Sequence, residues 1–357
     1  MSSEAEQTPE LSIVVPILNE REQLPGFLAG LAEQRELAYE LLICDGGSRD
    51  GGPEWLRQQE AEHPALRVLT GPSGRGRQLN QGARQARGRY LLFLHVDSRF
   101  SDPLALRKGV ASLARTGSAR VAGHFALRFA RTDDRPSSGY YFYEWKARLG
   151  RPETIHGDQG FLLRREMYDR LGGFREDLPA MEDTDFAERL RCRGQWRLLP
   201  AEIATSARRF ETEGLWQRQL LGALIMCFRS IGWQEFFDRA PAIYRQQSET
   251  ETLRLTPFFE LIRHQLGNKS RHDRWRVWHA SGMYVRKHAW QLFFALDARR
   301  AFHRGLPVGR GRTVLTTFFE PIYDLLTDHP LGRMAATLLL RAWFETTRAW
   351  LRRKEAR

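Results

Sequence analysis

The sequence is poor in cysteine and contains no long hydrophobic run. Its three cysteines, Cys44, Cys192 and Cys227, lie far apart, with neither a disulfide-framework nor a zinc-site spacing. The longest apolar run, Leu220–Phe228, is about half of the roughly 20 residues that a membrane-spanning helix needs. Both absences favour a protein of the reducing cytoplasm that does not cross a membrane.

A secretory signal is also missing, because residues 1–10 are polar and acidic rather than basic and then apolar. We expect this N-terminus to be disordered. The 357 residues, 42% hydrophobic and 27% charged, have an ordinary globular composition. The length suits one large domain, or a catalytic domain with an appendage.

Acidic residues are too few to balance the basic ones, so the formal net charge is +12, and arginine supplies most of it. Such a charge attracts nucleic acids, acidic lipid surfaces and phosphorylated substrates. No helix-turn-helix, zinc-finger or RNP signature accompanies the charge. We therefore predict no nucleic-acid partner.

The most informative stretch is a short apolar run followed by two chemically active side chains. Tyr90–Leu94 is preceded by Gly88 and is typical of a buried parallel strand. His95 and Asp97 follow it and would project beyond its carboxyl end, where open α/β sheets bind ligands. A carboxylate there can hold a hard divalent cation, and the cation a diphosphate. The alternative is that Asp97 is only a turn residue or a helix cap.

Strand and helix patterns alternate from the first strand pattern, Leu11–Pro16, to Tyr90–Leu94 with short connections. This alternation predicts an α/β fold with a mostly parallel sheet flanked by helices. A second strand pattern, Glu40–Cys44, ends on Asp45. Asp45 and Asp97 would then lie at the same edge of the sheet, which suggests a nucleotide site.

A basic, glycine-rich loop lies between these two carboxylates in the sequence. Gly71–Gly76 has the glycine spacing of a P-loop, but Arg77-Gln78 replaces the required Lys-[Ser/Thr]. No Gly-x-Gly-x-x-Gly follows the first strand pattern either. Glycine and arginine can still bind a diphosphate through backbone N–H groups and a fork of side-chain donors. A solvated basic turn is the alternative.

A second carboxylate cluster, Glu182-Asp183, opens a helix pattern that places Phe186, Leu190 and Cys192 inward. Acidic residues in a first helical turn are favoured by the helix dipole. On this pattern alone, capping and function both stay open for the cluster.

Together these motifs resemble family 2 glycosyltransferases with the GT-A fold. In chain order the motifs are Ile13-Val14-Val15-Pro16 with Asn19-Glu20, Asp45-Gly46-Gly47-Ser48 with Asp50, Asn80 with Gly82, His95-Val96-Asp97, Gly157-Asp158-Gln159-Gly160, Gly172-Gly173-Phe174 and Glu182-Asp183. Thr205–Arg209 resembles a segment of a compact bacterial branch of the family. The resemblance implies a GT-A domain over residues 11–231, and we expect an α-helical extension over residues 232–357.

The resemblance implies how a nucleotide-diphosphate sugar donor would bind. Asp45 would bind the base or ribose, near the Pro16 backbone and Glu20. Arg77 would approach the base or the diphosphate. Asp97 would bind a divalent metal, Mn²⁺ or Mg²⁺, with His95 in the other ligand position of the family's Asp-x-Asp motif. Imidazole carries no negative charge, so this departure bears on metal affinity and choice.

The resemblance also implies the reaction. Asp158 and Gln159 would form the wall around the donor sugar and the acceptor, and Glu182 would bind substrate beside them. Asp183 would be the catalytic base that takes the proton from an acceptor hydroxyl, and single displacement would invert the anomeric carbon. The acceptor is open, with lipid-linked and polysaccharide acceptors as candidates.

The C-terminal third is rich in tryptophan and arginine and has recurrent helical patterns, of which Glu213–Ser230 is the first. Its last pattern places Leu331, Leu338 and Trp343 on one face. A basic amphipathic helix of this kind can lie on an anionic membrane, which would make the protein peripheral on the inner face of the cell membrane. The alternative is a helix packed on a neighbour.

Two other functions compete with sugar transfer. A nucleotidyltransferase that makes sugar nucleotides would want a glycine-rich loop with a lysine after the first strand, where this chain has Ile17–Glu20. A non-catalytic scaffold that binds a membrane or a partner through its helices would have no affinity for nucleotides.

Overall fold

The computed structural model describes residues 9–178, 180–247 and 252–356. Its contacts divide the chain into two compact units. Unit 1 contains residues up to Ala130 together with Tyr143–Ser206, and unit 2 contains Arg131–Phe142 together with residues from Ala207 onward. The α-helical extension expected from the sequence begins at residue 232, later than unit 2 does. Residue 232 as the end of the glycosyltransferase domain stays a prediction. Of the N-terminus expected to be disordered, residues 1–8 lie outside the described residues.

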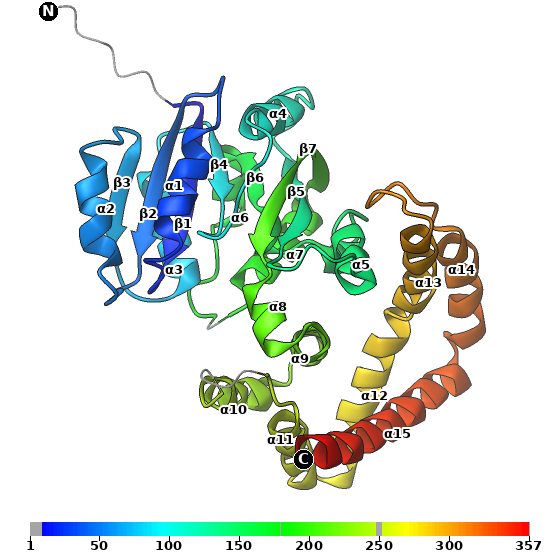
Figure 1. Ribbon diagram of the computed structural model, residues 1–357. Helices are drawn as coiled ribbons and strands as arrows, with labels where there is room; N and C mark the ends of the chain where they lie inside the picture. The colour runs from blue at the N-terminus through cyan, green and yellow to red at the C-terminus, as the bar shows by residue number, and fades with distance from the viewer. Residues whose placement is uncertain (1–8, 179, 248–251, 357) are drawn as a thin grey trace, which may run out of the picture. The chain divides into compact units, whose positions relative to one another are not determined.

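Unit 1 is built on one seven-stranded sheet (Figure 1). Its strands are β1 (Leu11–Ile17), β2 (Tyr39–Asp45), β3 (Leu66–Thr70), β4 (Tyr90–Phe93), β5 (Val121–Ala130), β6 (Phe161–Arg164) and β7 (Gln195–Ser206). Their order is β3-β2-β1-β4-β6-β5-β7, and β6 alone runs antiparallel to its neighbours. The predicted α/β class with a mostly parallel sheet is confirmed.

Helices cover both faces of this sheet, because its strands are apolar on both sides. The helices of unit 1 are α1 (Leu24–Ala32), α2 (Gly52–Glu60), α3 (Arg75–Gln85), α4 (Ala105–Ala114), α6 (Arg165–Leu171) and α7 (Glu182–Arg193), with 3₁₀ turns η1 (Pro152–Thr154) and η2 (Gly157–Gln159). One core joins α1, α2 and α4 to residues such as Ile13 and Val15, and a second joins α3, α6 and α7 to Val14. Every residue of β1 is buried, as a strand covered on both faces requires.

The helix α7 corrects one expectation. Phe186 and Leu190 are buried as predicted, but Cys192 is exposed. Six residues past Phe186, at about 100° per residue, the chain has turned well away from the buried face, so Cys192 points to solvent.

Unit 2 is helical. Its helices are α8 (Arg208–Glu213), α9 (Leu215–Ser230), α10 (Gln234–Arg245), α11 (Thr256–Gly267), α12 (Arg271–Lys287), α13 (Trp290–His303), α14 (Val314–Thr327) and α15 (Pro330–Glu355), while α5 (Ser138–Lys146) crosses the division between the units. The helix expected over Glu213–Ser230 begins only at Leu215, because Gly214 has a φ of 91° and separates α8 from α9. Among the described helices, none combines the length and apolar character that crossing a membrane takes.

Candidate active site

The loops that follow β1 and β2 are tied together at the carboxyl edge of the sheet. Asn19 adopts a φ of 55°, and its backbone N–H donates to Ser48 Oγ over 2.8 Å. The Arg49 N–H donates in return to Asn19 Oδ1 over 2.8 Å. This exchange fixes the backbone next to Glu20, one of the predicted donor-binding residues.

Asp45, the last residue of β2, is buried and shapes the loop that follows it. Its carboxylate accepts hydrogen bonds from the backbone N–H groups of Gly47 (3.1 Å) and Ser48 (3.0 Å). Pro16 lies on the neighbouring strand, in register with Cys44. The structure therefore brings Pro16, Glu20 and Asp45 to one edge, and it also gives Asp45 a structural task that the sequence pattern did not show.

The amino end of α3 is held at the same edge by Gln78, which the sequence interpretation did not assign. Gln78 Nε2 donates to the carbonyl oxygens of Ile17 and Cys44, both over 2.7 Å. A Cβ on Gly46 would lie 3.0 Å from the Gln78 amide, so a larger residue there would push this amide out of position. Arg77 lies in the first turn of α3 and is exposed, available to an anion. Arg75, the first residue of α3, lies 3.7 Å from the buried Glu182.

Asp97 and His95 follow β4 as expected, and Asp97 has a partner from the far edge of the sheet. Thr205 Oγ1, in β7, donates to Asp97 Oδ2 over 3.2 Å. Paired backbone hydrogen bonds between Arg99 and Ala204, both 2.8 Å, hold the two segments together. Thr205 belongs to a sequence motif, but the motif alone gave it no role. The neighbouring residues do not indicate that β7 lies beside the loop after β4.

Asp183 and His95 meet at Gly157. Asp183 Oδ2 accepts the Gly157 N–H over 2.8 Å, and Oδ1 accepts the Thr184 N–H over 2.7 Å. A Cβ on Gly157 would lie 3.2 Å from both Asp183 Oδ2 and His95 Nε2. His95, Gly157 and Asp183, from three distant parts of the sequence, therefore lie next to one another.

The charged groups near Gly157 shift one another's pKa values. Burial raises the pKa of Asp158 to about 6, and the charges of Asp183 and Asp97 add to the rise while His156 opposes it. Burial alone would raise the pKa of Asp183, but His156, the Gly157 N–H, His95 and the Thr184 N–H together lower it. Asp183 is thus held as a carboxylate at neutral pH. His156 is a second residue that the sequence interpretation did not assign.

Gln159 and Glu182 point into the protein more than expected for residues that touch substrate. Gln159 is 1% exposed, and its amide donates to the Thr154 carbonyl oxygen over 2.7 Å. Glu182 is 4% exposed, and burial followed by the charge of Asp183 raises its pKa. Their predicted roles in substrate binding stay predictions.

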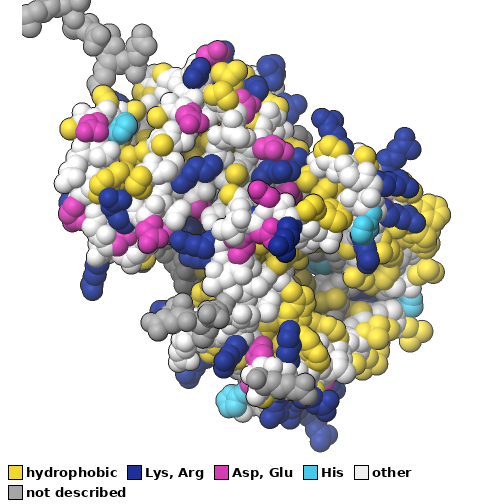
Figure 2. Space-filling model, viewed as in Figure 1, with side chains coloured by type: hydrophobic (Ala, Val, Ile, Leu, Met, Phe, Trp, Pro, Cys, Tyr) yellow, Lys and Arg dark blue, Asp and Glu magenta, His cyan; other side chains and the backbone are white. Residues whose placement is uncertain are grey.

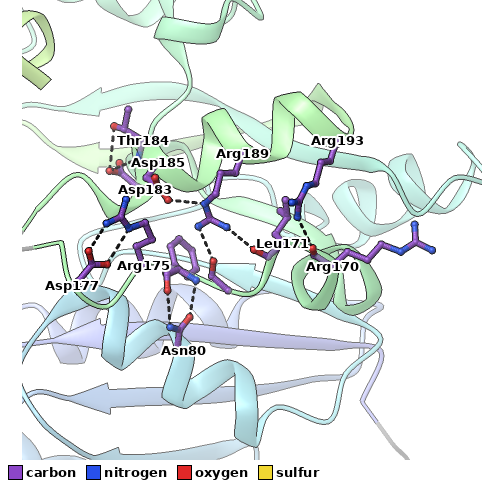
Figure 3. A network of polar contacts seen from close by, with 12 residues as sticks. Asn80, Arg170, Leu171, Arg175, Asp177, Asp183, Thr184, Asp185, Arg189 and Arg193 are labelled. Carbon is purple, nitrogen blue, oxygen red and sulfur yellow. Dashed lines mark hydrogen bonds and ion pairs between the residues drawn. The ribbon is translucent and has the colours of Figure 1, made fainter. Parts of the chain in front are cut away.

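A polar network holds the start of α7 and therefore Asp183 (Figure 3). Asn80 accepts the Phe174 N–H over 2.8 Å and donates to the Phe174 carbonyl oxygen over 2.9 Å. Arg189 reaches from α7 to Asp185 and to the carbonyl oxygens of Leu171 and Gly173, each over 2.7 Å. The network fixes the loop that enters α7.

The entry to α7 also carries local strain. Met181, directly before Glu182, has a φ of 68°, which is uncommon for a residue with a side chain. Backbone strain of this kind persists only where the surrounding structure determines it, and it clusters at functional sites.

The donor atoms around Asp97 suit a hard divalent cation. One oxygen of Asp158, Oδ1, is buried without a hydrogen-bond partner among the described residues, and the charges of Asp183 and Asp97 help to raise the pKa of this carboxyl group. No group of three or more His, Cys, Asp or Glu residues close enough to hold a metal by itself occurs among the described residues. Mg²⁺-type ions commonly bind one or two carboxylates and complete their shell with substrate phosphates.

Unit 1 is thus an α/β sheet with a cluster of carboxylates at its carboxyl edge. Residues 12–172 match glycosyl transferase family 2. The chain carries a domain of this family, with the mixed, mostly parallel GT-A sheet and a helical region after it.

Several curated proteins are similar to parts of this chain. The glycosyltransferase AglE of Haloferax volcanii is 31% identical over 125 residues, 34% of this chain and 41% of AglE. The dolichyl-phosphate beta-glucosyltransferase ALG5A of Trichomonas vaginalis is 30% identical over 118 residues, 30% of this chain and 36% of ALG5A. The matches thus span less than half the length of these two relatives.

Among solved structures, the chain is similar to the mannosyltransferase PcManGT from Pyrobaculum calidifontis in complex with GDP-Man and Mn²⁺. The identity is 19% and the TM-score 0.48, over 97% of this chain and 86% of PcManGT. S. aureus TarS 1–349 in complex with UDP is 15% identical with a TM-score of 0.44, over 78% of this chain and 72% of TarS.

Proposed function

We propose that this protein is an inverting glycosyltransferase that moves a sugar from a nucleotide-diphosphate sugar to an acceptor hydroxyl with a divalent metal, Mn²⁺ or Mg²⁺. The observation that carries the proposal is the placement of Asp183. Two backbone N–H groups and two histidines keep it ionised beside the carboxylates Asp97 and Asp158. Family membership of the domain supports the same reaction class.

The donor would lie along the carboxyl edge of β1, β2 and β4. Asp45, with Pro16 and Glu20, would bind the base or ribose. Arg77, exposed near the start of α3, would pair with the diphosphate, since a guanidinium offers a fork of donors that matches phosphate oxygens.

Asp97 and His95 would hold the metal, with Asp158 as a neighbouring carboxylate. When bound, the ion would supply positive charge that stabilises the departing nucleoside diphosphate. The Thr205 hydroxyl, 3.2 Å from Asp97 Oδ2, orients that carboxylate. Because an imidazole carries no negative charge, His95 would leave the site with one negative charge fewer than two carboxylates give.

Asp183 would act as the base. Its oxygens are fixed by the Gly157 and Thr184 N–H groups, so the carboxylate does not have to reorient to accept the acceptor's proton. Asp158 carries the opposite tendency, since burial first and the nearby carboxylates second raise its pKa to about 6.

The named curated relatives bear on the acceptor. AglE is named a glycosyltransferase and ALG5A a dolichyl-phosphate beta-glucosyltransferase, so a lipid-phosphate acceptor is the candidate we favour for this chain. A soluble saccharide acceptor is the alternative.

The test measures release of UDP or GDP from a panel of sugar donors with Mn²⁺ or Mg²⁺, for the wild type and Asp97→Asn. We expect one donor class to be turned over, and the variant to lose metal-dependent donor binding in titration calorimetry. A chain that binds neither nucleotide in the presence of metal would instead be a scaffold. A chain that forms sugar nucleotides from nucleoside triphosphates would be a nucleotidyltransferase.

A further inference from the structure

Helices α14 and α15 of unit 2 leave large apolar side chains in solvent. On α14, Phe318, Leu325 and Leu326 are 61%, 81% and 65% exposed. On α15, Leu331, Leu338 and Leu339 are 78%, 51% and 70% exposed. In each helix the second and third residues lie seven and eight positions after the first, so each helix presents them on one face. We call these six residues the exposed apolar face.

This face is not a core face turned outward by chance, because both helices also have an inner side. Phe344 of α15 is buried and stacks on Phe259 with ring centroids 5.0 Å apart. The buried Asp297 of α13 accepts the Thr316 N–H over 2.8 Å at the start of α14. Phe319 of α14 stacks on Phe293 of α13 at 5.8 Å. Each helix is thus held in an orientation that points the exposed apolar face away from unit 2.

Four acidic side chains on or between these helices are engaged within unit 2. Asp324 and Asp328 each lie 3.1 Å from Arg286. Glu345 lies 3.1 Å from Arg348, and Glu355 accepts the backbone N–H groups of Leu255 and Thr256. Their negative charge is therefore compensated locally.

Several arginines on α15 and just before α14 form no ion pair with a described residue. Arg300, Arg304, Arg310 and Arg312, at the end of α13 and in its connection to α14, are exposed and form no ion pair with a described residue. The same holds for Arg341 of α15 among the described residues. Figure 2 shows Lys and Arg gathered next to hydrophobic side chains in the region where Figure 1 draws α13 and α14.

We propose that the exposed apolar face inserts into the interfacial layer of an anionic membrane. The arginines Arg300, Arg304, Arg310, Arg312 and Arg341 would then contact the lipid headgroups. Apolar side chains beside a free basic rim are the signature of helices that lie in a membrane surface. Exposed apolar patches of this extent mark an interaction site rather than ordinary surface. The charge selects the occupant, because a second copy of this chain would bring the same unpaired arginines against the first.

The proposal does not depend on the sugar-transfer reaction, although a membrane-bound chain would meet a lipid acceptor at the same surface. Insertion of one Leu or Phe side chain contributes roughly tenfold or more to partitioning. Each arginine near an anionic surface contributes about fivefold. Together these contributions predict binding that falls when salt screens the charges.

The experiment is flotation of the full chain with two kinds of vesicle, phosphatidylcholine alone and phosphatidylcholine mixed with phosphatidylglycerol. We expect flotation with the anionic vesicles and a roughly hundredfold or greater loss for the variant Phe318→Ser, Leu325→Ser, Leu326→Ser. The matched pair is Leu325→Ser against Leu198→Ser, a leucine of β7 that is 40% exposed. Only the first should weaken binding. Arg310→Gln with Arg312→Gln should reduce the preference for anionic vesicles.

A site-specific probe distinguishes insertion from indirect effects. A polarity-sensitive dye on Leu325→Cys, in a Cys192→Ser background, should shift to the blue when anionic vesicles are added. The same dye on the exposed native Cys192 should not shift. No flotation of the wild type, or equal flotation of wild type and triple variant, would overturn the proposal. So would a dimer in light scattering that the triple variant converts to monomer, because the face would then bind a second copy.

Discussion

The two units of this protein leave different kinds of side chain outside their hydrophobic cores. In unit 1 the strands are apolar on both faces and helices cover both. The groups left outside these cores are polar ones at the carboxyl edge of the sheet, such as Asp158, whose buried Oδ1 has no hydrogen-bond partner among the described residues. In unit 2 the helices have one core on their inner side, and the groups left over are apolar, such as Leu325 and Leu331.

The side chains that a unit leaves outside its core indicate the chemical class of ligand that the unit binds. A buried carboxylate without a partner is costly, so a site that keeps one is built for a cation or a proton. An apolar side chain in water is costly for the opposite reason, so a face that keeps several is built for an apolar surface. We expect substitutions of the groups outside the two cores to change activity or binding, and substitutions of the buried groups to change stability.

The largest effect is expected for Asp183→Asn. The amide keeps the shape of the side chain and can still accept the Gly157 N–H, but it cannot take up a proton. We expect kcat to fall about a thousandfold, because general-base catalysis contributes that order of rate. Nucleotide binding by calorimetry should be unchanged. Normal turnover by the variant would remove Asp183 from the role of base.

A stability comparison within unit 2 should give the next largest effect. Phe344→Ala removes a ring that is 3% exposed and stacked on Phe259, and we expect a loss of about 3–5 kcal/mol in unfolding free energy. Phe318→Ala, on the exposed apolar face, should change it by less than about 0.5 kcal/mol. Denaturant unfolding measures both. Equal losses would mean that the exposed apolar face is covered within the protein itself.

A pH effect is expected from His124, which is buried in β5. Burial lowers its pKa to about 4, whereas the unfolded chain binds the proton near the ordinary pKa of 6.5. Between these values the unfolded state holds more protons, so stability should fall as the pH drops from 6.5 to 4, by up to about 3 kcal/mol. His124→Asn should flatten this part of the profile in thermal unfolding. An unchanged slope in the variant would assign the acid sensitivity to other groups.

A smaller effect on stability than that of Phe344→Ala is expected for Asn80→Ala. The change leaves the Phe174 N–H and carbonyl oxygen without their partner, which costs about 1–3 kcal/mol. Because the same network holds the entry to α7, kcat should fall more than KM changes. A variant with lower stability but normal kcat would make Asn80 purely structural. Gln81→Ala, a loss of one exposed hydrogen bond from α3, is the control.

Much of unit 1 could be predicted from the sequence. The short apolar runs, their turn residues and their alternation with helical patterns are local features, so the strands Leu11–Ile17 and Tyr39–Asp45 were located almost to the residue. The positions of Asp45, Asp97 and Asp183 after strands or at a helix start were predictable for the same reason. Their roles came from the resemblance, and the structure adds that Asp183 and His95 both border Gly157.

Other features were decided only by tertiary structure. Thr205 reaches Asp97, Gln78 reaches Ile17 and His156 acts on Asp183 because segments far apart in the sequence pack together. In unit 2 the helical period showed that Leu331 and Leu338 share a face, but a period does not say which side meets a neighbour. The sequence by itself thus determined the elements and their polar ends. Packing decided which polar ends meet and which apolar face stays in water, because both depend on contacts that local patterns do not contain.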